Sequence, residues 1–300
     1  MTDESRTDEV PTTLSATGLY ADITTGTLGD DVLAFEPQFP LWSDGAEKSR
    51  WVWLPPDTRI DTTDMDAWEF PAGTRFWKEF RRDGVRIETR LLVKRGDDDW
   101  LAVAYRWTAD QRDAVAVPFG VVDANGTTHD IPAAGECAAC HGGRRSFVLG
   151  FSAIQLSGPA VAGMIDLDGL IAAQRLSAPP AGKLVVPGTA DERAALGYLH
   201  ANCSHCHNQT RPASAPCFDP DRSFDFSLEV GDLATPADTA VYRTAIGEVI
   251  EPGHPDDSAV IRLMSRRGLV RQMPPLATEQ IDDAAVAQLR RWITNLEVEP

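Results

Sequence analysis

Two short segments of the chain share one pattern, in which two cysteines are separated by two residues and followed at once by a histidine. They are residues 137–141 and 203–207. Covalent haem attachment needs this pattern, because two thiols add to the porphyrin vinyl groups and the next residue places an imidazole under the iron. The sequence therefore predicts two covalently attached haem c groups. The thiols would come from Cys137, Cys140, Cys203 and Cys206, and the axial imidazoles from His141 and His207.

A methionine near the C-terminus is a candidate for a further axial ligand. Met273 is followed by Pro274 and Pro275, and it precedes a stretch with helical periodicity. Because proline fixes backbone φ, the two prolines would hold a loop that presents the thioether. We expect Met273 to bind the haem of the second motif, haem 2; a methionine that only fills the core is the alternative. His/Met ligation raises the reduction potential and favours electron transfer over ligand chemistry.

The haem of the first motif, haem 1, has no obvious sixth ligand in the sequence. Met164 and His129 are candidates, and Met65 and His200 are weaker ones. An open coordination position would permit ligand binding or peroxide chemistry. His205, which lies between the two cysteines of the second motif, is expected at the surface.

Other interpretations of the cysteines compete with haem. Four cysteines and two histidines could form a tetrahedral structural zinc site in a reducing compartment. However, zinc sites use their histidines at variable offsets, and the Met-Pro-Pro segment would then have no role. A redox disulfide would leave both trailing histidines unused. A dihaem enzyme such as a peroxidase is the remaining alternative, so the sequence favours an electron carrier without excluding an enzyme.

The composition limits the partners of this chain. Its 300 residues carry a formal net charge of −17, and 43% of them are hydrophobic, which suffices for a sizeable core. An acidic surface repels nucleic acid and anionic lipid and suits a basic redox partner. No apolar run reaches the length that spans a bilayer, so we expect no membrane span.

The first ten residues conflict with haem attachment. They are polar and acidic, without the basic and apolar regions of an export signal. Haem c is attached outside the bacterial cytoplasm, so we expect a periplasmic or otherwise exported protein. On this expectation, the sequence is a trimmed or mis-started version of the precursor.

The secondary-structure signals change near residue 135. Residues 86–95 and 101–107 alternate between apolar and polar, with a turn at residues 96–99, which predicts an antiparallel hairpin. Most of the tryptophans lie in this first part, as is typical of strands. Toward the C-terminus, Val286, Leu289, Ile293 and Leu296 recur at helical spacing.

With these residues in hand, the chain resembles a family of bacterial proteins, mostly described as hypothetical or as dihaem c-type cytochromes. The resemblance covers most of residues 30–297, and its C-terminal part also looks like a class I cytochrome c domain. It implies haem binding and electron transfer, whereas the physiological partner is poorly defined in that family. As redox partner we expect a dehydrogenase or a terminal acceptor. The segments that carry it are residues 40–48, 70–74, 77–80, 88–92, 131–132, 137–141, 149–151, 155–156, 198–203, 252–255 and 273–276.

The patterns and the resemblance together predict an α+β protein, with an antiparallel β-rich N-terminal domain followed by an all-α cytochrome c-like domain. Residues 1–19 would be a flexible N-terminal segment and residues 20–135 the β-rich domain. Residues 136–188 would carry the first haem and a linker, and residues 189–300 would form the cytochrome c-like domain.

Overall fold

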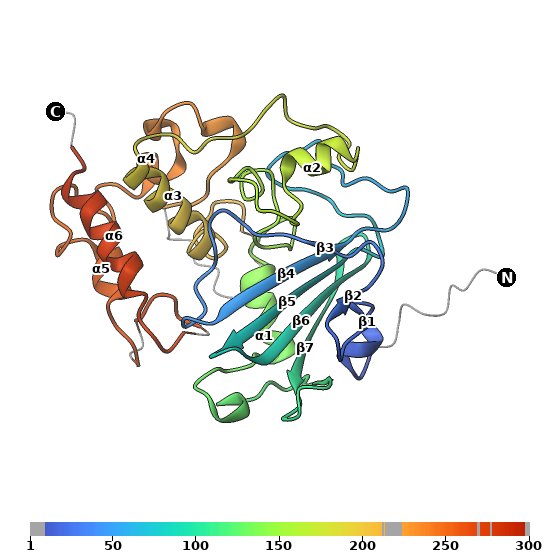
Figure 1. Cartoon of the computed structure of the whole chain (residues 1–300). Coiled ribbons are helices and arrows are strands. Elements are labelled where there is room, and N and C mark those ends of the chain that lie inside the picture. Colours follow the sequence, from blue (N-terminus) through green and yellow to red (C-terminus); the bar gives the residue numbers. More distant parts are fainter. Residues whose placement is uncertain (1–9, 212, 214–223, 269–270, 277, 298–300) are drawn as a thin grey trace.

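An antiparallel sheet of six strands is the centre of the computed structural model, which describes residues 10–211, 213, 224–268, 271–276 and 278–297. Its strand order is β3-β4-β5-β6-β7-β8, and β1 and β2 form a separate pair (Figure 1). The strands are β1 Tyr20–Asp22, β2 Thr27–Leu28, β3 Leu33–Ala34, β4 Glu47–Trp53, β5 Arg75–Arg82, β6 Val85–Gly96, β7 Asp99–Trp107 and β8 Ala114–Ala116.

The predicted hairpin is confirmed by strands β6 and β7. Thr89 pairs with Tyr105 and Leu91 with Val103, and the chain turns between Gly96 and Asp99. Residues directly opposite each other in an antiparallel pair lie on the same face, so the apolar members of the alternation meet across the two strands.

One face of the sheet packs against the N-terminal part of the chain. Trp51, Trp77, Leu91 and Val103 are register partners across four strands and belong to one buried cluster. Residues 14–19, which were expected in a flexible segment, cover this face through side chains that include the fully buried Leu14 and Leu19 and a short 3-10 helix, Leu14–Thr17.

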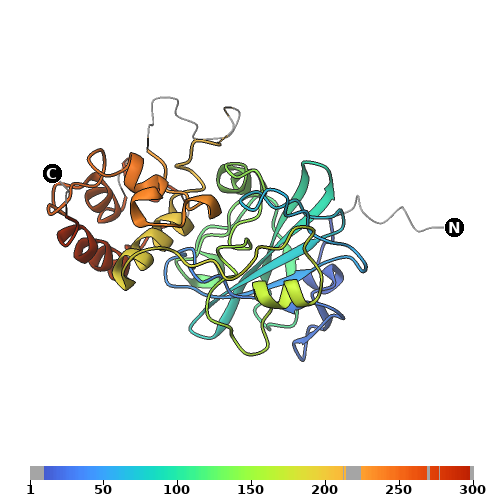
Figure 2. The same cartoon turned by 90° about the horizontal axis from the view of Figure 1, so that it is seen from above.

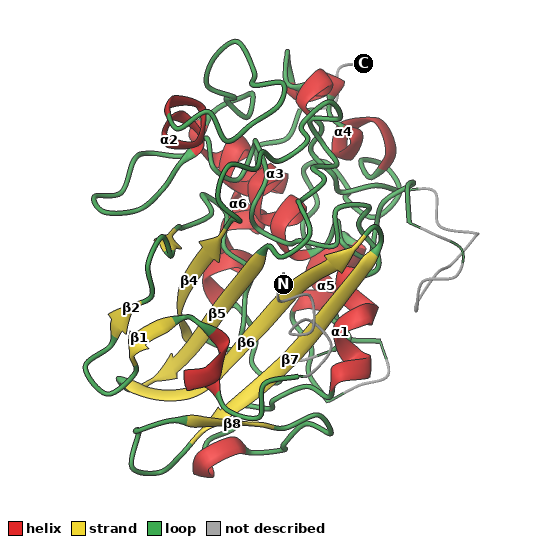
Figure 3. Ribbon diagram, turned by 90° about the vertical axis from the view of Figure 1, so that its right-hand side faces the viewer, coloured by secondary structure: helices red, strands yellow, loops and turns green. Residues whose placement is uncertain are grey.

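The opposite face of the sheet carries both aromatic and charged side chains. At one end, Phe76 packs edge-on against Phe151, with ring centroids 5.2 Å apart, and Phe35 packs against the same ring at 4.8 Å. Helix α1, Ala134–His141, contacts β7 (Figure 3), and helix α2, Leu167–Ala172, buries Leu167 and Leu170 in the aromatic cluster. This face therefore receives the first Cys-x-x-Cys-His motif, which α1 carries.

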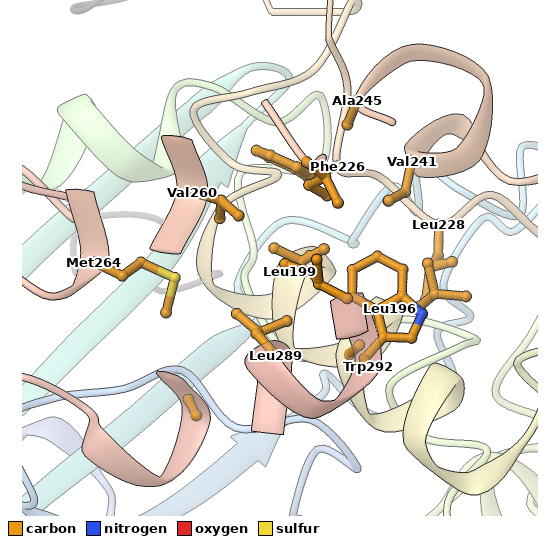
Figure 4. Packing of buried hydrophobic residues seen from close by; sticks show 14 of the residues in the cluster. Leu196, Leu199, Phe226, Leu228, Val241, Ala245, Val260, Met264, Leu289 and Trp292 are labelled. Atoms are coloured by element: carbon orange, nitrogen blue, oxygen red, sulfur yellow. The ribbon is translucent and has the colours of Figure 1, made fainter. Parts of the chain in front are cut away.

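The remaining helices gather at one end of the molecule (Figure 2). They are α3 Ala190–Asn202, α4 Ala240–Thr244, α5 Ala259–Met264 and α6 Asp283–Thr294. Their core includes Leu199, Phe226, Leu289 and Trp292 (Figure 4). The helical stripe predicted near the C-terminus is confirmed, because Leu289 and Ile293 of α6 are fully buried.

The expected all-α cytochrome c-like domain over residues 189–300 is a wrong prediction. Helices α4 and α5 contain only five and six residues, and long stretches between the helices are turns and loops. Proline and glycine explain much of this, since Pro252, Gly253 and Pro255 precede α5 and proline removes a backbone donor. The described protein is built mainly on antiparallel strands, with six short α-helices.

None of the helices in the described residues is long and apolar enough to cross a membrane. This agrees with the expectation that the chain has no membrane span.

Asn202, the last residue of α3, connects the helical part to the loop before β4. Its Oδ1 accepts a hydrogen bond from the backbone N–H of Trp42 at 2.7 Å, and its Nδ2 donates to the carbonyls of Pro40 and Tyr198 at 3.3 and 3.0 Å. The side chain is 3% exposed. Buried backbone groups without partners are costly, so this amide holds the two parts in place.

We predict that Asn202→Ala lowers the free energy of unfolding by about 2 kcal/mol, because it removes the three hydrogen bonds of a buried amide and leaves the half-buried N–H of Trp42 without its partner. Asn295→Ala is the matched control: Asn295 is exposed, and its Nδ2 also donates to the carbonyl four residues earlier, at 3.0 Å. The control should change stability by no more than about 0.5 kcal/mol. Urea unfolding measures both, and equal effects would contradict the role assigned to Asn202.

Candidate functional site

The first motif lies at the end of helix α1, with its histidine held in a defined orientation. Nδ1 of His141 lies 2.7 Å from the carbonyl oxygen of Phe147. A carbonyl can only accept, so Nδ1 carries the proton and the lone pair is on Nε2. Burial, the largest cause, lowers the pKa of His141 to about 4, so the ring is neutral at pH 7. A neutral imidazole with its second nitrogen hydrogen-bonded is the form that binds a metal.

The second motif follows helix α3, which begins at a capping box. The side chain of Thr189 accepts from the backbone N–H of Glu192, and Glu192 in return accepts from that of Thr189 at 2.7 Å. Beyond the helix, the N–H of His207 donates to the carbonyl of Cys203 at 2.8 Å, which keeps the motif in a tight turn.

Aromatic rings surround the histidine of the second motif. The ring of His207 stacks on Phe224 at a centroid distance of 4.9 Å and meets Phe226 edge-on at 5.6 Å. Cys203 packs against the C-terminal core, and burial raises its pKa to about 12, so the thiol is neutral. The surroundings of this motif are therefore apolar.

The two motifs are in direct contact, which the sequence did not predict. Arg211 donates to the carbonyl of Ala139 in the first motif at 3.0 Å and to that of His205 in the second at 2.6 Å. The side chain of Asn208 joins the same segments, since its Nδ2 donates to the carbonyls of Gly143 and Ser204 at 3.1 and 2.6 Å.

Glycine and cysteine complete this contact. A Cβ at Gly143 would overlap the carbonyl oxygen of His205, so only glycine permits this approach. The side chain of Cys206, more than burial, raises the pKa of the Cys140 thiol, so the two cysteines influence each other across the contact between the motifs. Residues from two separate parts of the chain thus form one site.

A cavity of about 800 Å³ opens beside the first motif. Cys137, Cys140 and His141 line it together with strands β4, β5 and β6 of the sheet. Such a volume is ordinary for the site of a cofactor or a drug-sized ligand, which commonly occupies about 300 to 1,000 Å³. The cavity places a large ligand within reach of both thiols and of the imidazole.

The four residues predicted as candidates for the sixth ligand of haem 1 lie in different surroundings. His129 lines the cavity, whereas Met164 lies at a different hollow of about 260 Å³ and is 38% exposed. Met65 packs against the aromatic cluster, and Nδ1 of His200 accepts a hydrogen bond from the N–H of Leu228 at 3.0 Å. Of these four residues, His129 alone belongs to the described lining of the cavity.

His205 was expected at the surface, and this is wrong. It is 7% exposed and lines the cavity, and its Nδ1 has no hydrogen-bond partner among the described residues. Its position follows from the contact between the motifs, which no local pattern in the sequence reveals.

Met273 lies in the loop between α5 and α6. Its backbone N–H donates to the carbonyl of Leu263 at 3.1 Å, and its side chain packs against the same core as Cys203. The bond from Met273 to Pro274 is cis. Ligation of haem 2 by Met273 stays a prediction.

A buried charge cluster lies at the edge of the cavity. Glu88, fully buried, accepts two hydrogen bonds from Arg90 at 2.6 and 2.9 Å, and Nε2 of His129 lies 2.9 Å from its second oxygen. Burial raises the pKa of Glu88, but Arg90 and His129 outweigh it, so the net shift is downward and the group is a carboxylate. His129 is thereby held at the cavity wall.

The chain has no recognisable relative in three comparisons, since no family model, no curated protein and no solved structure matches it. Within the residues that the structure describes, no three side chains of Cys, His, Asp or Glu form a group that could hold a metal ion.

We predict that Glu88→Gln lowers the free energy of unfolding by about 3 kcal/mol at pH 7, because the half-buried Arg90 then loses its fully buried carboxylate partner. The pKa of Glu88 is lower in the folded protein than in the unfolded chain, so its stabilisation is present at neutral pH and is lost as the pH falls through the folded-state value. The difference between wild type and variant should therefore shrink below a pH of about 4.

Urea unfolding at a series of pH values measures this difference. Glu248→Gln, at an exposed glutamate, is the control and should change stability by no more than about 0.5 kcal/mol at any of them. A Glu88→Gln difference that persists undiminished in acid would mean that the carboxylate is not the source of the effect.

Proposed function

We propose that this protein is a c-type cytochrome that transfers single electrons through two covalently bound haems. The observation that carries the proposal is the contact between the two Cys-x-x-Cys-His segments, one of which opens into a cavity of about 800 Å³. Haem, when bound, supplies an iron that gains and loses one electron.

The first motif fits a haem in three respects. Its thiols line a cavity of suitable volume, and His141 presents Nε2 with its lone pair available. The carbonyl of Phe147 fixes the orientation of the ring, as the outer partner of a metal-bound histidine does. Cys137 and Cys140 would bind this haem.

The second motif would hold its haem through Cys203, Cys206 and His207. Phe224 and Phe226 pack against the imidazole of His207 and give it an apolar setting. Met273 is the proposed second ligand, since it packs against the same core as Cys203. His/Met ligation would make haem 2 the site of higher potential.

The contact between the motifs gives electrons a short route. Arg211 hydrogen-bonds to both motifs, and Asn208 joins the second motif to Gly143, two residues after the first. Because these bonds hold the two segments together, the arrangement suits relay between two centres. We propose an exported, periplasmic setting and a redox partner protein, either a dehydrogenase or a terminal acceptor.

We predict two covalent haems on protein matured in a host that exports it and attaches haem c. Intact mass and an alkaline pyridine spectrum count them. The double variants C137A/C140A and C203A/C206A should each lose one haem, because each removes one pair of thiols. The fifth cysteine supplies the control, since Cys217, which lies outside the described residues, belongs to neither motif and its alanine variant should keep both haems. Colourless protein without added mass would refute the proposal.

We predict that Met273→Ala abolishes the methionine-to-iron charge-transfer band and lowers the potential of haem 2, because the thioether ligand raises that potential. Met65→Ala is the control, since Met65 packs in the aromatic cluster of the sheet. Near-infrared absorption and a redox titration measure both effects. An unchanged band in Met273→Ala would assign the sixth position to another group.

A further inference from the structure

Three basic side chains form a row across the face of the sheet that borders the cavity. Arg50 of β4 pairs in register with Lys78 of β5, and Lys78 pairs with Arg90 of β6. Directly opposite residues share a face, and like charges placed opposite each other are destabilising. All three line the cavity beside the first motif. We call them the basic row. A protein of net charge −17 thus concentrates positive charge in its interior.

Two members of the basic row, Arg50 and Lys78, have no carboxylate partner in the described residues, although Nζ of Lys78 lies 5.0 Å from the Phe80 ring centroid. Glu88 bonds to Arg90 and His129. In the described residues, no side-chain carboxylate lies within hydrogen-bonding or ion-pair distance of Arg50 or Lys78. Glu36 and Glu88 act on them at longer range, while Lys48 adds a further positive charge beside Lys78.

The acidic groups of the cavity lining are occupied elsewhere or exposed. Asp44 accepts from the backbone N–H groups of Glu279 and Gln280 at 2.8 and 3.1 Å. Glu136 accepts from the N–H of Ala133 at 2.7 Å and is exposed. Asp130 accepts from the N–H of Asp123 at 2.9 Å.

Desolvation makes this arrangement costly. Arg50 is 7% exposed, and burial, the largest cause, lowers the pKa of Lys78 well below its ordinary value. Removing a cation from water without giving it a counter-charge costs roughly several kcal/mol of folding free energy. Buried cations in proteins are therefore usually paired with an anion. The basic row therefore points to a negatively charged ligand.

The neighbours of the basic row define the rest of that ligand. Phe76 and Leu92 lie on the same face and also line the cavity. The site therefore joins an apolar wall to a cationic edge, which fits a molecule with a large apolar body and acidic groups at one side. Guanidinium groups match the planar geometry of carboxylates.

We propose that the basic row binds the carboxylates of the ligand that fills this cavity. The source of those carboxylates rests on the proposed function: a haem attached at Cys137 and Cys140 carries two propionates, and Lys78 and Arg50 pair with them. A free dicarboxylate is the second possible source. Lys78, at the centre of the row, is a positioning residue in the first case and a binding residue in the second.

The experiment compares Lys78→Met with Lys94→Met in the haem-loaded protein. Lys94 lies on β6 on the same face as Arg90, outside the cavity lining, with its Nζ 5.2 Å from the Trp100 ring centroid. Lys78→Met should shift the propionate bending bands in resonance Raman spectra. It should also make reduction of one haem about tenfold less favourable, which is 59 mV for one electron. Lys94→Met should change neither, and Lys78→Arg should keep both close to wild type.

Thermal unfolding gives a second readout that a purely structural lysine would not produce. In the C137A/C140A background, Lys78→Met should raise the unfolding midpoint, because it removes a half-buried cation without a counter-charge. In the protein with both haems it should lower the midpoint, because it removes a partner of the propionates. Destabilisation of equal size in both backgrounds would overturn the proposal.

Calorimetry with succinate distinguishes the two sources of carboxylate. If the Raman bands do not move, but succinate binds to wild type and not to Lys78→Met, the basic row binds a free dicarboxylate. If neither effect is seen, the row does not bind carboxylates and the proposal fails. Intact mass reports haem attachment separately, so failure of the proposed function is visible independently of either result.

Discussion

The contact that Arg211 makes with both Cys-x-x-Cys-His segments is the constraint on which the site depends. This buried guanidinium bonds to the carbonyls of Ala139 and His205, and thereby fixes α1 relative to the turn after α3. The first segment is then held over the charged face of the sheet, and the second against the C-terminal core. The side chain of Arg211 thus sets the position of the first Cys-x-x-Cys-His segment relative to the second.

The two faces of the central sheet differ in composition and in their contribution to the protein. The face with Trp51, Trp77 and Leu91 is dry and packed by the N-terminal segment, so it stabilises the fold. On the other face, Arg50, Lys78 and Arg90 lie in the middle of long, well-paired strands, at positions where apolar residues would be usual. A sheet tolerates such a row only when its first face and its aromatic end provide the burial that holds the strands together.

Local signals in the sequence predicted the elements better than their assembly. The alternation in β6 and β7 and the stripe of α6 were predictable, because each repeats within one element. The prediction of an all-α domain over residues 189–300 was wrong, because an apolar stripe does not determine the length of a helix, and prolines and glycines keep α4 and α5 short. The basic row and the burial of His205 depend on strand register and on the Gly143 contact, which join residues far apart in the chain. The two Cys-x-x-Cys-His motifs could be recognised from the sequence, because the predicted haem attachment requires this spacing.

The distribution of charge links these observations. The net charge of the chain is −17, whereas the cavity wall carries Arg50, Lys78 and Arg90, so anions are attracted locally by the wall although the molecule as a whole repels them. Inside, each cation must find a negative partner or lose its charge, and Glu88 satisfies Arg90 while leaving Lys78 and Arg50. Carboxylates that entered the cavity would therefore complete an electrostatic network that the protein alone leaves incomplete. On this argument the sheet does more than support the first motif, because its basic row determines which molecules the cavity can hold and how they are oriented.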